Sequence, residues 1–568
     1  MRVQDCTQTY TLYIAQNKTP IMRIKTQKPI LFLAILVFFI FYACSEDEVS
    51  FEDTKEVVEK PEEIDPNKIV TINTSSVVGP LYNFWSTRPM VNQTRFNSSN
   101  FTNGLDNIKS YVKNYNLVRV LGGRTDNLNT FYKGVDGSGN IITDFRGLLT
   151  SMRNFMRTGF KPRIVLDNVP WAMNAVQEIN VYGNTNPPDN YDLWRQYIAA
   201  FLQTLIDEFG YDEVKTWRFR VGTEPNYAPQ HWNGTARDYF KHYDITVDEV
   251  LKLIPDAIIG PGNMLTEGVA TFTTELIEHC AKGTNYATGK IGTQMDFFSI
   301  SYYEKMDQNT VRLENVVAPY RAALNSYSQF ADIPLDIHEF GILRDEKGVR
   351  GVSLTDATEF GASWYATIAD LAYKYGIHEI YDWGQEVQSS NLPQGRKNVT
   401  KMFQMMEDGN RVASMDNFIS VNAGVIPVVK NNNIYLLVYN HNTTRNSSAS
   451  RVLYPKIVGG QVSGTNSWKM NEWTVDKNNG VFMHQLYEDI RTAGVNENFN
   501  GRIYGNRPSD RFAEGWKTIL NTNLAQYEQL AELPQTITDS IVQKMDDNLT
   551  LKINLAPHSV KLIELIPQ

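Results

Sequence analysis

Two glutamates stand where carboxylates could carry out acid–base and nucleophilic chemistry. Glu224 lies in "RFRVGTEPNYAP", directly after an apolar run typical of a buried strand, and Glu339 closes a similar run in "LDIHEFG". Glycoside hydrolysis uses such a pair, because one carboxyl protonates the leaving oxygen while the other attacks the anomeric carbon. A single glutamate at a strand end could equally cap the next helix, so the prediction depends on the pair.

Polar and aromatic side chains near other strand-like runs could bind sugar hydroxyls and ring faces. Arg124 could hold a sulfate or carboxylate with its fork of donors, or form a salt bridge to Asp126. His231 and His338 lie close in sequence to the two glutamates, and strand alternation predicts that His338 points away from Glu339 and packs. The other candidate contacts are Asp167, Asn168, Trp171, Tyr303 and Trp383, of which Asp167 and Asn168 could equally fix their loop.

Short apolar runs alternate with amphipathic segments from about residue 68, which is typical of repeated βα units and a parallel sheet. One helical stretch ends at Gly376, a C-cap signal. Eight such units predict an α/β fold with a (β/α)₈ barrel over residues 67–410. The eight runs are IVTINTS, LVRVLGG, PRIVLDNV, WRFRVGTE, AIIGPGN, FFSISYY, LDIHEFG and EIYDWGQ.

The barrel explains why strands should end in carboxylates. Active sites of (β/α)₈ barrels lie at the C-terminal ends of the strands. Glu224 closes the fourth run and Glu339 the seventh, and these two strands face each other across a barrel. We therefore expect the two carboxyls to approach a bound sugar from opposite sides.

The chain changes character after about residue 410. Alternation with a period of two, as in "NIYLLVYNHN" and "LTLKINLAPHSVKLIELIP", replaces the helical pattern. We expect no further helices there and predict a β-sandwich accessory domain over residues 411–568. The run "KIVTINT" could start the barrel or add a strand to this sandwich.

The motifs also resemble glycoside hydrolase family 39, the group of β-xylosidases and α-L-iduronidases, over most of residues 70–415. "VGTEPN" is similar to the family's acid/base motif and "DIHEFG" to its nucleophile segment, which implies Glu224 as acid/base and Glu339 as nucleophile. "LVRVLGG" and "DFFSISYY" resemble the family's second and sixth strands, and so imply Arg119 and Tyr303 as substrate contacts. The resemblance also implies a barrel followed by a β-sandwich.

The chain departs from the family pattern around the sugar to be cleaved. Thr223 stands where the family usually has Asn, and Leu121 and Ser301 stand where it usually has His. Thr223 and Asn226, on either side of the acid/base, remain candidate substrate contacts. These changes spare the catalytic pair, so we expect the family's mechanism with a substrate other than xylose or iduronate.

The N-terminus resembles a lipoprotein export signal. Fourteen apolar residues, 30–43, follow five basic residues and precede Cys44. This run is too short to cross a bilayer and fits the apolar part of a signal peptide. The stretch "FYAC" resembles a bacterial lipobox, which predicts removal of residues 1–43 and lipidation of Cys44. A start at Met22 instead of Met1 would give a signal of ordinary length.

Residues 45–65 hold ten acids and two lysines, so residues 44–66 are expected to form a solvated tether, similar to the acidic export signals of Bacteroidetes surface lipoproteins. We expect a lipid-anchored protein of the bacterial outer membrane, surface-exposed or on the periplasmic face. Loss of five positive charges and one negative charge with residues 1–43 takes the net charge from −9 to about −13, which argues against a nucleic-acid partner. Only Cys280 then remains, which excludes disulfides and cysteine metal sites.

The leading hypothesis is a retaining, exo-acting glycoside hydrolase of a polysaccharide or oligosaccharide, with no cofactor and no metal. One alternative is a hydrolase of sulfated or anhydro-sugar algal galactans. Another is a non-catalytic, surface glycan-binding protein. The presence of both Glu224 and Glu339 favours an enzyme, because a binding module needs neither.

Overall fold

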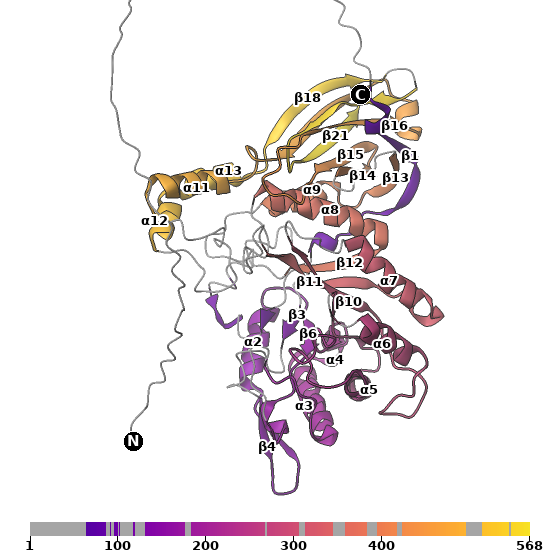
Figure 1. Ribbon diagram of the computed structural model, residues 1–568, viewed down its shortest axis with the longest axis vertical. Coiled ribbons are helices and arrows are strands. Elements are labelled where there is room, and N and C mark those ends of the chain that lie inside the picture. The colour runs from indigo at the N-terminus through magenta and orange to yellow at the C-terminus, as the bar shows by residue number, and fades with distance from the viewer. Residues whose placement is uncertain are drawn as a thin grey trace, which may run out of the picture. The chain divides into compact units, whose positions relative to one another are not determined.

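The computed structural model describes residues 64–568 apart from 87–90, 93–95, 100–101, 103–116, 120–130, 177–182, 267, 269, 306–312, 345–357, 383–394, 417–422, 496–513 and 545–546. The described residues belong to one unit, Glu63–Gln568. Its parallel strands and its large antiparallel sheet are seen in Figure 1. No helix among the described residues is both long and apolar enough to cross a membrane.

Eight parallel strands form the barrel, with β8 and β9 together providing the fifth. They pair as two runs, β2-β3-β6-β7-β8 and β9-β10-β11-β12. Most of their described side chains are buried, as expected for parallel strands covered on both faces. The strands are β2 (Val91–Asn92), β3 (Leu117–Arg119), β6 (Arg163–Leu166), β7 (Arg218–Val221), β8 (Ile258–Pro261), β9 (Met264–Leu265), β10 (Phe298–Lys305), β11 (Leu335–Arg344) and β12 (Ile377–Asp382).

Local sequence signals set the limits of the helices between these strands. Asn190 caps α3 by accepting from two backbone N–H groups, and Thr235 opens α5 with a capping box. Gly376 ends α8 at a φ of 65°, which confirms the predicted C-cap. The helices are α2 (Arg146–Met156), α3 (Tyr191–Phe209), α4 (Tyr211–Val214), α5 (Ala236–Leu253), α6 (Ala270–Lys282), α7 (Leu313–Asn325), α8 (Glu359–Tyr375) and α9 (Gly395–Met406). A hairpin of β4 (Tyr132–Val135) and β5 (Ile141–Thr143) precedes α2.

The C-terminal region forms a sheet in the order β18-β17-β21-β15-β14-β13-β1-β16-β19, with β20 paired to β16. The run counted as the first barrel strand, β1 (Ile69–Pro80), belongs to this sheet, antiparallel to β13 and parallel to β16. That count was therefore wrong, and β2 takes the first place in the barrel. The other strands are β13 (Asn410–Asp416), β14 (Ala423–Lys430), β15 (Asn433–Asn440), β16 (Arg451–Val458), β17 (Ser467–Val475), β18 (Gln535–Gln543), β19 (Leu549–Thr550), β20 (Ile553–Leu555) and β21 (Val560–Pro567).

The expectation of no helices beyond residue 410 was also wrong. A short turn, α10 (Gly460–Ser463), follows β16. The described residues between β17 and β18 include α11 (Met483–Thr492), α12 (Glu514–Thr522) and α13 (Leu524–Ala531). Met483, Leu486 and Ile490 recur at helical spacing and form part of a small separate core. The fold class itself, a (β/α)₈ barrel followed by a β-sheet domain, is confirmed.

One hydrophobic core joins the barrel to the sheet domain. Helix α8 contacts β14, β15 and β21, while α9 contacts β17, and both helices lie between barrel and sheet in Figure 1. Ile426, Tyr435 and Leu562 of the sheet belong to the same buried cluster as the barrel strands. The sheet therefore packs against α8 and α9, the helices that precede and follow the eighth barrel strand, and completes their burial.

Candidate active site

Glu224 lies on a tight turn at the C-terminal end of β7. Its side chain is buried, and its backbone has a φ of 46°, in the left-handed region that few residues other than glycine adopt. Gly222, two residues earlier, has a φ of 79°. The Glu224 amide donates to the carbonyl of Asn263, 3.0 Å away, at the end of β8. Backbone strain held in place by neighbouring strands is common at functional sites, where it fixes a side chain's direction.

His231 contacts the Glu224 carboxyl. The distance between Nε2 of His231 and Oε2 of Glu224 is 3.3 Å, with the two side chains 10% and 7% exposed. Sequence analysis noted His231 only as a neighbour of Glu224 along the chain. The turn that follows Glu224 brings the imidazole back onto the carboxyl.

Glu339 is buried on β11, and Oε2 of its carboxyl accepts a hydrogen bond of 2.8 Å from the Tyr303 hydroxyl of β10. The ladder between these strands passes from the pair Ile300–Ile337 to the pair Ser301–Glu339, so His338 is an extra residue on β11. Such an irregularity re-aims the side chains that follow it. The predicted contact residue Tyr303 therefore orients the second carboxylate.

A chain of buried polar groups runs beneath the turn. Arg220 of β7 donates to the Thr223 hydroxyl over 2.9 Å, and this hydroxyl donates to Oδ2 of Asp167 over 2.8 Å. Arg220 also lies 3.3 Å from Nδ1 of His338. The only proton of the Thr223 hydroxyl is thus given to Asp167, so Thr223 has no donor left for a sugar hydroxyl.

His338 is buried within the barrel, as the prediction of a packed histidine requires. Its ring lies against Phe297 and Tyr381, with centroids 5.5 and 4.9 Å away. Burial is the main cause that lowers the pKa of His338 to about 3. The imidazole is therefore neutral near pH 7.

Three other predicted contacts lie on the same face. The side-chain amide of Asn226 exchanges two hydrogen bonds with the backbone of Leu265, and the amide of Asn168 donates to the carbonyl of Asn184. These bonds fix loops, while the role of both residues in binding sugar stays a prediction. Trp171 begins a short 3₁₀ helix, and its buried indole N–H has no hydrogen-bond partner among the described residues.

A pocket of about 30 Å³, room for roughly one water molecule, lies beside the turn. The predicted contacts Asp167, Asn168 and Thr223 line this pocket together with His231. Pro225 and Trp232 add apolar surface to it. The pocket therefore shows that these predicted contacts meet beside the turn.

The remaining predicted residues lie outside what the structure describes. These are Arg124, Trp383, Leu121, the lipidation residue Cys44 and the side chain of Arg119, whose backbone forms the end of β3. Their assigned roles stay predictions.

Sequence reasoning missed two polar residues of the site, Arg220 and Asn263. Asn263 is fully buried at the end of β8, and its side-chain N–H donates to the Ser301 hydroxyl over 2.6 Å. Its place at a strand end was a signal of the kind that identified the glutamates. For Arg220 the signal was an arginine at alternate positions with Arg218 inside an otherwise apolar strand, since both must then face the barrel interior.

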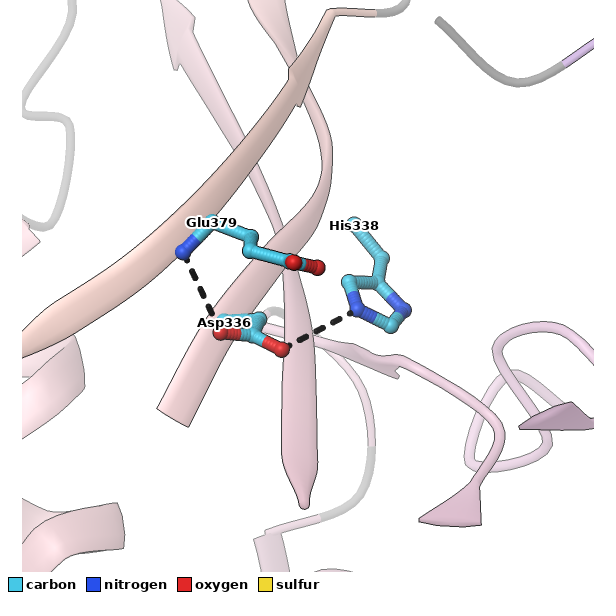
Figure 2. Close-up of side chains that lie close together, drawn as sticks. All are labelled: Asp336, His338 and Glu379. Atoms are coloured by element: carbon cyan, nitrogen blue, oxygen red, sulfur yellow. Dashed lines mark hydrogen bonds and ion pairs between the residues drawn. The ribbon is translucent and has the colours of Figure 1, made fainter. Parts of the chain in front are cut away.

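Asp336, His338 and Glu379 converge inside the barrel, with ligand atoms within 4.8 Å of one another (Figure 2). Arg218 already pairs with both carboxylates, at 2.7 Å from Asp336 and 2.6 Å from Glu379. Burial opposes ionisation of Asp336, but the Arg218 guanidinium outweighs it and lowers the pKa of Asp336 to about 2. Arg163 adds a third ion pair, 2.9 Å from Glu379. This charge balance fits a structural ion network rather than a metal site.

Known proteins share this arrangement of strands. The α-1,4-L-rhamnosidase of Formosa agariphila is 21% identical over 356 residues, which are 59% of this chain and 71% of that protein. The β-xylosidase of Geobacillus stearothermophilus is 25% identical over 218 residues, 36% of this chain and 42% of that protein. The crystal structure of the GH39 enzyme from Xanthomonas axonopodis pv. citri matches with a TM-score of 0.64 at 15% identity, over 90% of this chain and 100% of that one.

The comparison with known families agrees with the barrel and with the two glutamates at its strand ends. The profile of glycosyl hydrolases family 39 matches residues 68–360, just over half of the chain, and this range contains both Glu224 and Glu339. The protein therefore belongs to glycosyl hydrolases family 39 and is a glycosidase.

Proposed function

We propose that the protein is a retaining, exo-acting glycoside hydrolase in which Glu224 is the acid/base and Glu339 the nucleophile. The observation that carries the proposal is the different environment of the two buried carboxyls. Glu339 accepts from the Tyr303 hydroxyl, as an ionised nucleophile does, whereas Glu224 lies against a histidine that can stabilise its carboxylate between the two steps. Acid and nucleophile have different roles, and the different contacts of the two carboxyls support this assignment.

In the first step Glu224 gives its proton to the glycosidic oxygen while that oxygen leaves the anomeric carbon. The Glu339 carboxylate forms the new bond to this carbon, which gives a glycosyl ester. In the second step Glu224, now a carboxylate, takes a proton from water, the water oxygen bonds to the anomeric carbon, and the ester bond to Glu339 breaks. Two inversions preserve the configuration, and the mechanism requires carboxyls about 5–5.5 Å apart.

The decisive experiment compares Glu224→Ala with Glu339→Ala. The acid is needed for poor leaving groups, so Glu224→Ala should lose about 10²-fold or more activity on oligosaccharides, less on aryl glycosides, and recover on the latter with azide. Glu339→Ala should be inactive on both. Glu275→Ala, on the exposed face of α6, is the control for expression and folding. NMR of the first product should show a retained anomer, and an inverted product would refute the nucleophile assignment.

The first substrates to test are terminal α-L-rhamnosides, because the rhamnosidase match covers more of this chain than the xylosidase match does. The panel should include aryl β-xylosides, α-L-iduronides and algal galactan oligosaccharides. The Thr223 hydroxyl donates its proton to Asp167. This supports a contact with the terminal sugar that differs from the one made by the asparagine that the family usually has at this position.

We also propose that the enzyme is anchored to the outer membrane through a lipid on Cys44. The support is the sequence alone: an apolar run of signal length, a lipobox-like "FYAC" and an acidic tether. A surface anchor would hold a glycosidase where polysaccharide fragments enter the cell.

A further inference from the structure

The turn after β7 folds back on itself so that His231 meets the acid/base. The Tyr227 amide donates to the Glu224 carbonyl over 2.9 Å, and the His231 amide donates to the Tyr227 carbonyl, also over 2.9 Å. The imidazole lies against the Tyr227 ring, with centroids 5.7 Å apart. These two backbone bonds and the ring contact hold Nε2 of His231 at 3.3 Å from Oε2 of Glu224.

Other titratable groups surround this pair among the described residues. Asp167, directly after β6, and Arg220 of β7 reach the turn through the Thr223 hydroxyl. Glu339 of β11 and Tyr303 of β10 lie on the opposite side of the barrel. His242 of α5 lines the same pocket as His231, and burial lowers the pKa of His242 to about 3, so it is neutral. His231 contacts the Glu224 carboxyl directly.

The charge of Glu224 changes twice in each catalytic cycle of the proposed function. Its carboxyl is neutral before the first step, carries a full negative charge while the glycosyl ester exists, and is neutral again after water is deprotonated. Both side chains are almost out of solvent, where water cannot stabilise that charge and a fixed donor has its largest effect.

We propose that His231 is a positioning residue for the acid/base: it holds the Glu224 carboxyl through Oε2, and its Nε2–H stabilises the carboxylate between the two steps. The inference rests on the proposed function of Glu224. Because the imidazole and the carboxyl are in contact, their titrations are coupled, and the alkaline limb of kcat/KM belongs to both groups.

The charge of the imidazole sets the direction of the expected pH effect. In the free enzyme, a protonated His231 places a positive charge 3.3 Å from Oε2 of Glu224, which favours the carboxylate, so Glu224 loses its proton at lower pH. Replacing His231 removes that charge. His231→Phe should therefore move the alkaline limb upward by about one pH unit, the size expected when an opposite charge within about 4–6 Å is lost.

The experiment measures kcat and KM against pH for wild type, His231→Phe and His231→Gln. The substrate is 4-nitrophenyl α-L-rhamnopyranoside, or 4-nitrophenyl β-D-xylopyranoside if only the latter is cleaved. His231→Gln keeps an N–H donor but cannot titrate, so its alkaline limb should also move upward while kcat at the optimum falls less than in His231→Phe. KM should change little, because the imidazole acts on Glu224 and not on the sugar.

His242→Gln is the matched control, because it disturbs packing in the same pocket. The ring centroid of His242 lies 5.1 Å from that of Trp232, which also lines the pocket. Its alkaline limb should stay at the wild-type pH. Should His231→Phe fail to fold, the limb of His231→Gln decides. The proposal is overturned if the alkaline limb of kcat/KM in the folded His231 variants stays at the wild-type pH. It is also overturned if His242→Gln shifts that limb by the same amount as the His231 variants do. Full activity of Glu224→Ala on oligosaccharides would instead refute the proposed function itself.

Discussion

Thr223 lies beside the proposed acid/base, a position that predicts a substrate contact, but its hydroxyl is bonded within the protein. Its hydroxyl accepts from Arg220 and donates to Asp167, and all three side chains are buried. The hydrogen-bond capacity of the residue is therefore directed into the protein. Asp167, which accepts this bond, also lines the small pocket beside the turn.

Thr223→Val tests this chain of contacts, because valine has the shape of threonine without the hydroxyl. The free energy of unfolding should fall by about 1–3 kcal/mol, since two hydrogen bonds to charged side chains are lost in a buried place. Urea unfolding measures the change, and Thr223→Ser, which keeps the hydroxyl, should stay closer to wild type. Equal stability of the Val and Ser variants would show that the hydroxyl contributes nothing.

At the scale of elements, β8 supports the turn that carries the acid/base. The Asn263 carbonyl accepts from the Glu224 amide. Gly262 leaves no room for a side chain, because a Cβ there would lie 2.9 Å from Cδ of Pro225 and 3.1 Å from the carbonyl carbon of Gly222. The residues that follow β8 thus set the place of the proposed acid/base, which follows the neighbouring strand β7.

Gly262→Ala should displace this turn, since the atoms in the way belong to a proline ring and to backbone. A displacement of about 1 Å at a catalytic group costs on the order of 10²-fold in rate, so kcat/KM should fall by about that factor on aryl glycosides. Gly147→Ala in α2, where a Cβ meets nothing within 4 Å, is the control. Wild-type kcat/KM in a folded Gly262→Ala enzyme would mean that the turn yields without moving Glu224.

The sequence predicted the barrel elements that end in the glutamates, because long apolar runs and strand-end acids are local signals. It missed β2, whose two residues are too few for any periodicity, and it could not place β1, whose alternating burial suits a sandwich as well as a barrel edge. The extra residue at His338 and the His231–Glu224 contact depend on turns and ladder irregularities that leave no pattern. Helix α11 was recognisable from its Met483–Leu486–Ile490 spacing.

At the scale of the whole molecule, the proposed lipid on Cys44 can be tested directly. Cys44→Ala should prevent lipidation, so the variant should leave the membrane fraction or accumulate unprocessed. Fractionation with detection of the enzyme, and mass spectrometry of the mature N-terminus, measure both outcomes. Ser45→Ala is a suitable comparison that leaves the cysteine intact. A Cys44→Ala protein that is processed and retained like wild type would contradict the lipid anchor.

The first strand of the sheet domain is made before the barrel, and both of its partners are made after it. Strand β1 pairs through residues 69–80 with β13 and β16, which span residues 410–416 and 451–458. During synthesis β1 must therefore wait, with both edges unpaired, until the ribosome has passed the whole barrel. Such distant pairing is slow, and waiting edges are prone to aggregation. Any chain that ends before residue 451 therefore lacks β16 and leaves one edge of β1 without its partner strand, so truncation in the sheet domain should cause aggregation even when the barrel is complete.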